Sequence, residues 1–384
     1  VLFRSWPSAA HALGWTAWVG AEGLVRSAAL VAWTPWVTWR VVPPSWWVVV
    51  FHYAAWVATW WLWRGARQPS PWTAPAWRRR LVPLCGVVAA IAVARPPLLA
   101  ASRTGDGHLH VTFIDVGQGD AALVRFPRGN TLLIDAGGLP GGGGFDIGER
   151  VVAPVLRQAG VRRLGVVALS HGDADHAGGA EAVLREFYPF MLWEGVPVPR
   201  LPVTTRLRAA ALEEGTLWTN LQALDRTTVD GVDVQVLHPR VPEWERQRTR
   251  NDDSVVLELR WRDVSFVFPG DLGADGEADV VPRLEPARLR VLKVPHHGSQ
   301  TSSSPAFLAA LRPDAAVISV GRANTFGHPS PPVLARYVAA GVALFRTDQA
   351  GAVFMESDGT TIDVRTWTGD RTRLTPYEPA RAPP

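Results

Sequence analysis

The sequence predicts an α+β domain that follows a shorter, α-helical and membrane-like segment. Of the 19 tryptophans, 14 lie in residues 1–77. Short runs of Val, Leu, Ile and Phe separated by Gly-containing turns begin at His108, as in paired β-strands. A chain of 384 residues that is 47% hydrophobic is too long for one ordinary core. We therefore expect domains at 1–104 and 105–370 and a disordered, proline-rich tail at 371–384.

The two predicted domains differ in charge. Residues 1–104 hold ten arginines and one acid, Glu22, which gives +9. The other 29 basic and 34 acidic residues of the chain give −5. The tryptophan density of the first domain suits a membrane–water interface better than a soluble core. We expect membrane lipid to be a partner of this basic segment.

The strongest candidate for a membrane span is the stretch 45–63. Its 19 residues carry no charge, and about 20 residues are needed to cross a hydrocarbon core. A shorter apolar stretch, 81–94, is a second candidate. The segment 24–39 mixes apolar residues with one arginine and one proline, as in an amphipathic helix at a membrane surface.

An arginine-rich loop separates the two candidate spans. If both cross, the positive-inside rule places that loop in the cytoplasm and the chain beyond residue 101 on the outer face. The second domain is then extracytoplasmic. Val1 is not a methionine and no signal-peptide pattern follows it, so we expect the C-terminal part of a longer membrane protein.

In the second domain, the pattern indicates strands, one flexible loop and helices in alternation. A strand that leads into a polar loop ahead of a helix commonly places ligands at the carboxyl edge of a sheet. The expected elements are β runs within 108–126 and 130–138, a glycine-rich loop at 137–144, a helix at 145–159, a strand at 162–170 and a helix at 180–187.

Four potential metal ligands follow the strand 162–170 within six residues. In an extended or tightly turned loop, His171 and Asp173 point the same way and can meet at one ion. Asp175 and His176 then turn toward a second ion. The alternative is a solvated acidic turn in which an aspartate caps the next helix.

Two later strands also end in residues that bind metals. Asp271 follows the apolar run 264–268, and His296 and His297 follow 289–294. Adjacent histidines of an extended chain point to opposite sides, so at most one is expected on a given ion. Together these strand ends predict a site at one sheet edge. Cys85 is the single cysteine, so the ligands are nitrogen and oxygen, which suit Zn, Mn or Fe.

A series of seven motifs carries a family resemblance. It resembles the metallo-β-lactamase-type domain at the C-terminus of the ComEC family of DNA-uptake proteins, and the preceding segment resembles the end of that family's membrane competence domain. The motifs, in order, are FIDVGQGDA, LLIDAGG, LSHGDADHAGG, NDDSVVLEL, FPGDLG, VPHHGS and GRANTFGHPSP.

The resemblance implies an αββα sandwich with two divalent metal ions at one edge of the central sheets. His171 and Asp173 would hold the first ion, Asp175 and His176 the second, and Asp271 would bridge them. His297, or else His296, would complete the second site. The resemblance also implies a ligand role for the position of Asn251, where other members have histidine. Asp173 likewise stands where many members have histidine, which favours Mn over Zn.

The implied reaction is metal-assisted hydrolysis of a DNA phosphodiester. Asp175 is expected to act in catalysis, and His296 and His328 would contact phosphate or protonate the leaving group, although both histidines also fit ordinary turns. Asp135 would orient a ligand histidine. Asp115, Gln118 and Asp120 would line the groove or form an ordinary turn.

The net charge of −5 gives no independent sign of DNA binding. Arginine groups such as Arg157, Arg162 and Arg163 could form a track, but their spacing does not place them on one face. The expected partners, by resemblance, are single-stranded or double-stranded DNA, other competence DNA-uptake proteins and a second copy of the chain. The resemblance also places the chain in the cell inner membrane as a multi-pass protein.

Two other functions remain open. A phosphorylcholine-esterase-like hydrolase would use the same two ions on another phosphoester. A non-catalytic gate of a membrane channel would retain the fold but hold less than one equivalent of metal.

Overall fold

The computed structural model describes residues 7–33, 46–65, 84, 87, 105–139, 145–240, 248–322 and 324–376. The chain divides into two compact units, Val1–Ala100 and Ala101–Pro384. Each unit is described by itself.

The first unit contains two long helices, α1 (Pro7–Trp33) and α2 (Trp46–Gly65). Helix α2 includes residues 46–63 of the predicted span 45–63, and Trp46 and Trp61 are exposed, to 77% and 69%. Among the described residues, no helix has both the length and the apolarity that crossing a membrane requires. The predicted span is therefore not confirmed. The second stretch, 81–94, lies almost entirely outside the described residues, as does the end of 24–39.

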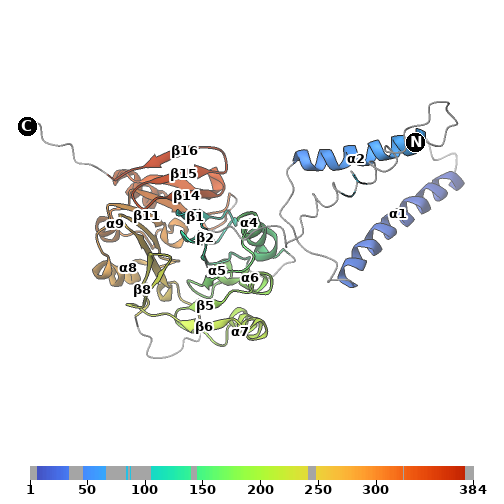
Figure 1. Cartoon of the computed structure of the whole chain (residues 1–384). Helices are drawn as coiled ribbons and strands as arrows, with labels where there is room; N and C mark the ends of the chain where they lie inside the picture. The colour runs from blue at the N-terminus through green and yellow to red at the C-terminus, as the bar shows by residue number, and fades with distance from the viewer. Residues whose placement is uncertain are drawn as a thin grey trace, which may run out of the picture. The chain divides into compact units, whose positions relative to one another are not determined.

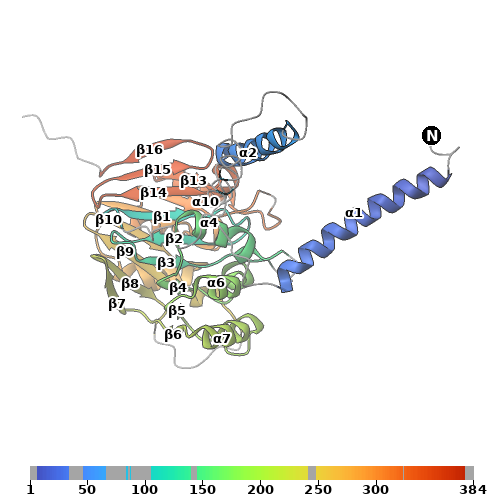
Figure 2. The same cartoon turned by 45° about the vertical axis from the view of Figure 1, so that its right-hand side comes forward.

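The larger sheet of the second unit has nine strands. Figure 2 shows them stacked from β16 to β6 in the order β16-β15-β14-β1-β2-β3-β4-β5-β6. Their bounds are β1 Leu109–Phe113, β2 Ala122–Arg125, β3 Thr131–Ile134, β4 Val166–Ala168, β5 Met191–Glu194, β6 Leu217–Asn220, β14 Val353–Ser357, β15 Ile362–Thr366 and β16 Arg371–Leu374.

The smaller sheet has seven strands in the order β13-β12-β11-β10-β9-β8-β7. Strands β10 to β13 are parallel to one another. The bounds are β7 Arg226–Val229, β8 Val232–His238, β9 Val256–Trp261, β10 Val264–Phe268, β11 Leu289–Lys293, β12 Ala315–Ile318 and β13 Ala343–Arg346.

Three apolar clusters define four layers. One lies between the sheets and includes Phe113 and Phe266. A second joins the nine-stranded sheet to the helices on its outer face, and a third joins the seven-stranded sheet to its own helices. Figure 1 shows α4, α6 and α7 on one side of the strands and α8 and α9 on the other. This is the αββα arrangement that the resemblance implied.

The helical segments of this unit are short. The α-helices are α4 Ala153–Gln158, α5 Ala174–Ala177, α6 Ala180–Phe187, α7 Pro202–Glu214, α8 Ala274–Val280, α9 Pro305–Leu311, α10 Pro331–Ala339 and α11 Thr347–Ala350. The 3₁₀ and π segments are η2 Gly148–Val152, η3 Asn251–Asp253, η4 Val281–Arg283 and η5 Pro295–Gly298. Helix α6 has the predicted bounds, whereas the predicted helix 145–159 is a π-helical turn followed by α4.

The predicted tail begins too early. Strand β16 occupies 371–374 and pairs antiparallel with β15, from Ile362 opposite Leu374 to Arg365 opposite Arg371. The pairing supplies backbone partners that a disordered tail would lack, so the domain extends at least to Leu374. Residues 377–384 lie outside the described part of the chain.

Candidate metal centre

The candidate site lies where strand ends of both sheets meet. Asp135 follows β3 and the segment 171–176 follows β4, and both strands belong to the nine-stranded sheet. Asp271 follows β10, and the histidine pair follows β11, in the seven-stranded sheet. The prediction of one sheet edge is therefore corrected, because ligands from two facing sheets can surround an ion more fully than ligands from one.

The histidine pair does not lie on an extended chain, contrary to the expectation. His296 and His297 have φ values of 50° and 52°, in the left-handed region, within η5. Such conformations are strained for residues with a Cβ and cluster at functional sites. The tight turn directs His297 inward, where it is 2% exposed, while the His296 side chain is 25% exposed.

Four side chains converge in what we call the deep half of the site, namely Asp175, His176, Asp271 and His297. Asp271 contacts both imidazoles, with Oδ1 at 3.1 Å from His176 Nε2 and Oδ2 at 3.4 Å from His297 Nε2. Asp175 Oδ2 lies 3.4 Å from His297 Nε2 and 4.0 Å from His176 Nε2. The two Nε2 atoms and the two carboxylates thus face a common centre.

Several of these facing atoms have no hydrogen-bond partner among the described residues. They include His176 Nε2, His297 Nε2 and Asp271 Oδ1, which are buried. Leaving buried polar atoms unpaired costs about 1–3 kcal/mol each, so a fold that gathers them at one point indicates a ligand there. Imidazole nitrogen and carboxylate oxygen are the donor set for Zn, Mn or Fe. The residues present therefore fit a divalent metal ion.

The opposite ring nitrogens of the two histidines are held by the protein. Asp135 Oδ2 lies 2.8 Å from His176 Nδ1, and Asp135 also accepts from the Ser170 backbone N–H and hydroxyl. His297 Nδ1 donates to the Ser319 carbonyl at 2.9 Å. These bonds direct each Nε2 lone pair to the common centre, which is how proteins orient metal-binding imidazoles. Asp135 thus lies where the predicted orienting role requires.

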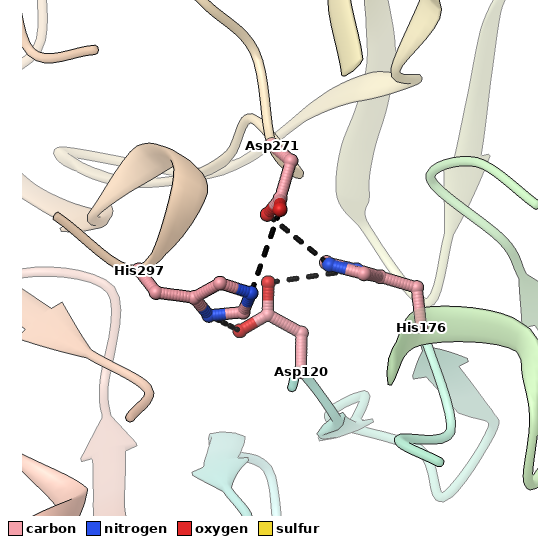
Figure 3. A group of neighbouring side chains, drawn as sticks. All are labelled: Asp120, His176, Asp271 and His297. Atoms are coloured by element: carbon pink, nitrogen blue, oxygen red, sulfur yellow. Dashed lines mark ion pairs between the residues drawn. The ribbon is translucent and has the colours of Figure 1, made fainter. Parts of the chain in front are cut away.

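Asp120 belongs to the same buried cluster. One ligand atom of each of Asp120, His176, Asp271 and His297 lies within 4.8 Å of the others, and Figure 3 shows these four side chains pointing toward one another. However, Asp120 approaches the Nδ1 atoms, at 3.7 Å each, and not the Nε2 atoms.

Asp120 also forms a buried ion pair with Lys293. Lys293 Nζ donates to the Gly270 carbonyl at 3.1 Å and lies 3.7 Å from Asp271 Oδ1. Although burial opposes its protonation, the charges of Asp120 and Asp271 raise the pKa of Lys293. We therefore assign Asp120 as the counter-ion of Lys293, which leaves Asp175 and Asp271 to balance one divalent cation.

The deep half attracts positive charge. Burial opposes ionisation of Asp271, yet the neighbouring imidazoles of His297 and His176 hold the pKa of its carboxyl well below the usual value. Conversely, although burial opposes its protonation, Asp271 and Asp135 raise the pKa of His176. A field that favours a proton on imidazole also favours a metal cation at the same place.

The outer half of the site holds His171, Asp173, Asn251 and His296. His171 Nε2 lies 3.4 Å from Asp173 Oδ2 and makes no hydrogen bond among the described residues. Asp173 is 40% exposed and also accepts from the Thr249 hydroxyl. The Asn251 amide lies 3.1 Å from His296 Nε2. The Asn251 side chain thus lies in the outer half, where its amide faces the imidazole of His296.

His296 and His328 face each other at the mouth of the site. Their ring centroids are 5.7 Å apart, and His296 Nε2 lies 3.8 Å from Asp271 Oδ2. Burial lowers the pKa of both imidazoles, which keeps them neutral near pH 7. Asn324 anchors His328, since its side chain bonds both the backbone N–H and the carbonyl of that residue.

Close backbone approach explains two glycines in the motifs. Gly119 has φ of 122°, and a Cβ there would lie 2.3 Å from the Asp175 carbonyl oxygen. A Cβ on Gly138 would lie 2.0 Å from the Ala174 carbonyl oxygen. Both turns therefore pack directly on the segment that carries Asp175 and His176, and a side chain would push it away.

The sequence reasoning missed Lys293. Its rarity is visible in the sequence, since it is the single lysine among 39 basic residues, but rarity alone indicates no role. A second signal was its place in β11, whose five residues are all buried. A lysine is almost never fully buried without a partner, so that position called for a carboxylate nearby.

Comparisons with known proteins agree with this geometry. A family model described as the Metallo-beta-lactamase superfamily matches residues 114–322. The chain is similar to ComE operon protein 3 of Bacillus subtilis, at 32% identity over 63% of this chain and 32% of that protein. It is also similar to Competence protein ComA of Neisseria gonorrhoeae, at 35% identity over 63% of this chain and 31% of that protein.

A third relative, Recombination protein 2 of Haemophilus influenzae, is 32% identical over 59% of this chain and 26% of its own length. The chain thus spans about a third of the length of the relatives it matches. These similarities confirm the resemblance to the ComEC family, and the buried Asp/His cluster together with the fold indicates a metal-dependent hydrolase. Because the family model matches more than half of its residues, the chain belongs to the metallo-beta-lactamase superfamily.

Proposed function

We propose that the second unit is a metal-dependent nuclease that hydrolyses DNA phosphodiester bonds during DNA uptake. One observation carries this proposal. The side chains of Asp175, His176, Asp271 and His297 converge on one centre, and the Nε2 atoms of the two histidines have no hydrogen-bond partner among the described residues. The names of the relatives, which include a competence protein, favour DNA as the substrate.

The two halves of the site suggest unequal ion binding. In the proposal, one ion binds firmly in the deep half and a second binds weakly in the outer half, to His171, Asp173 and Asp271. Asp173 supplies a hard oxygen ligand where histidine would favour zinc. Mn²⁺ is therefore the proposed ion, and Zn²⁺ is the alternative.

The bound ions would supply Lewis acidity and lower the pKa of water. The protein's own contribution is to hold the phosphodiester and to manage protons at the mouth of the site. His296 and His328, neutral near pH 7, lie where a phosphate at the outer half would contact them. Each neutral imidazole would donate an N–H hydrogen bond, one to a phosphoryl oxygen and the other to the leaving 3′ or 5′ oxygen, which would take its proton from water.

The location of the domain is part of the same proposal. The two apolar stretches 45–63 and 81–94, with the arginine-rich loop between them, would place it on the extracytoplasmic side of the inner membrane. There the hydrolase would meet DNA before entry and degrade the strand that is not imported. This part of the proposal rests on composition alone.

Incubation of the full chain with single-stranded DNA and Mn²⁺ tests the proposal. We expect nicking by the unchanged chain and none by Asp271→Asn, which keeps the size of the side chain but removes its charge. The matched control is Asp233→Asn, at the exposed position of the otherwise buried strand β8 in the same sheet, which should cut normally. Absence of cleavage with Mn²⁺, Zn²⁺ and Mg²⁺ would overturn the nuclease assignment.

Metal analysis separates the nuclease from a non-catalytic gate. We expect about one equivalent of firmly bound metal in the purified full chain and less in Asp271→Asn. A metal-free chain that still supports DNA uptake when His176 is changed to alanine would favour the gate.

A further inference from the structure

An open pocket rich in arginine lies on the nine-stranded sheet, apart from the metal centre. Its volume is about 1450 Å³, and none of the metal-site residues lines it. Strands β1, β2 and β14 to β16 form its floor, and the chain that leaves α4 contributes a wall. Six arginines line it, namely Arg125, Arg162, Arg163, Arg365, Arg371 and Arg373. We call it the arginine pocket.

The strand register arranges the floor in two rows across the sheet. In the first row Arg371, Arg365, Phe354 and Thr112 lie opposite one another on successive strands. The second row, built in the same way, contains Arg373, Asp363, Glu356, His110 and Arg125.

The second row is balanced by charge pairs within it. Asp363 lies 3.6 Å from Arg373, and Glu356 lies 3.8 Å from His110. These contacts resemble the cross-strand ion pairs that stabilise ordinary sheets. The second row therefore needs no ligand to explain it.

The first row differs, because two arginines face each other directly without an acid in the row. Arg365 on β15 is opposite Arg371 on β16, and like charges in directly opposed positions destabilise a sheet. Both residues are exposed. Strand pairing alone gives no reason for this opposed pair, and an anionic ligand bound between the two arginines would offset their repulsion.

The wall adds positive charge to the same pocket. Arg162 and Arg163 follow α4, and Arg163 Nε donates to the Tyr188 carbonyl at 2.9 Å, which fixes its direction. Across the lining, six guanidinium groups outnumber the three carboxylates of Asp106, Glu356 and Asp363. This local excess occurs although the chain beyond residue 104 carries −5.

An aromatic ring lies among the arginines. The Arg365 guanidinium is stacked over the Phe354 ring at 4.3 Å from its centroid. Stacked arginine and aromatic planes also provide a surface for unpaired bases, and basic grooves that bind single strands combine such surfaces with backbone contacts. A base pair in a duplex would not expose its face in this way.

We propose that the arginine pocket binds single-stranded DNA, with Arg365 and Arg371 contacting phosphates and Phe354 supporting a base. The segment 1–104 does not complement the pocket, since it carries +9. This inference rests on the proposed function, because it gives the same substrate a second contact away from the metal centre.

Binding measured without metal tests the inference separately from catalysis. A fluorescein-labelled single-stranded oligonucleotide is titrated with the full chain in EDTA, and anisotropy is followed at several salt concentrations. In the double variant Arg365→Gln/Arg371→Gln we expect affinity to fall by about tenfold at low salt. The slope of log K against log salt should decrease by about 1.4, since each single-strand phosphate contact contributes about 0.7.

The matched control removes the same charge elsewhere. Arg206→Gln/Arg288→Gln changes two arginines that are 61% and 63% exposed and lie outside the pocket. It should bind as the unchanged chain does. Phe354→Leu should weaken binding of the single strand but leave binding of the equivalent duplex unchanged.

Two results would overturn the inference. One is equal affinity and salt slope for Arg365→Gln/Arg371→Gln and for the unchanged chain. The other is equal loss in the control double variant, which would indicate a general charge effect. Because binding is measured in EDTA and cleavage requires metal, a failed nuclease assay and a failed binding assay remain distinguishable.

Discussion

The deep and outer halves of the metal centre share residue types but differ in how the protein supports them. In the deep half, His176 is fully buried and His297 is 2% exposed, and each Nδ1 has a fixed partner. In the outer half, His171 is likewise buried, with Nδ1 at 3.0 Å from the Ser170 hydroxyl, but the Asp173 side chain is 40% exposed and His296 is 25% exposed. Their polar atoms contact Thr249 and Asn251.

This difference teaches that ligand-type residues alone do not make equal sites. A ligand held in one direction loses little freedom when an ion binds, whereas an exposed one must be ordered first. In the proposed function, the deep half therefore keeps an ion, whereas the more open outer half exchanges ions or accepts phosphate.

Asp175→Asn and Asp173→Asn break the comparison most directly, because the same change two residues apart affects different halves. We expect Asp175→Asn to lose the firmly bound ion and about a thousandfold in cleavage rate, since a Lewis acid contributes several kcal/mol. Asp173→Asn should keep that ion and lose about tenfold. Metal analysis and rate measurements on both variants check this, and equal losses would contradict unequal halves.

Lys293→Met is expected to lower the free energy of unfolding by about 3–5 kcal/mol, because it leaves the buried Asp120 charge without its partner. Urea denaturation of the full chain, followed by tryptophan fluorescence, measures the change. Adding Asp120→Asn to the same chain should restore most of the stability. If the double variant is no more stable than Lys293→Met, Asp120 is not the counter-ion.

Asp135→Asn is expected to weaken metal binding in the deep half by about 10–100-fold, since it weakens the acceptor that orients His176. Competition with a coloured chelator measures the affinity. Asp146→Asn, which changes an exposed carboxylate on the same unit, should leave the affinity unchanged. An unchanged affinity in Asp135→Asn would show that His176 is held by packing alone.

Asn251→His changes the outer half alone and is expected to have the smallest effect of these changes. A histidine there would add an imidazole to the outer half, and we expect the firmly bound metal to rise toward about two equivalents. Equilibrium dialysis against Zn²⁺ counts the ions. No rise in Zn²⁺ would indicate that the contact between residue 251 and His296 keeps this position away from the ion.

Much of the fold could be predicted from local pattern. The runs at 109–113, 122–125 and 131–134 are β-branched or otherwise apolar and are separated by turns, so their strands were visible. Helix α6 was predicted with its observed bounds, and its buried residues have the i, i+3, i+4, i+7 spacing of one helix face. Strand β16 was not, because it has two arginines in four residues and depends on pairing with β15.

The candidate site also could be predicted only in part. The ligand-type residues His171, Asp175, His176, Asp271 and His297 were visible because each follows an apolar strand and has few structural uses there. Their assignment to two halves was implied by resemblance, and whether each residue binds metal stays a prediction. The role of Lys293 was invisible, since its partner Asp120 lies on the opposite sheet.

By itself, the sequence determined the strands, the turns and the side chains that end them, because these depend on neighbours a few residues apart. The tertiary structure decided which imidazole nitrogen faces the centre and which carboxylate neutralises a lysine. It also placed arginines from β15, β16 and the chain after α4 in one pocket. The first two outcomes depend on charges that the two facing sheets bring within a few ångströms. The pocket depends on pairing between strands that lie far apart in the sequence, and a local pattern determines neither.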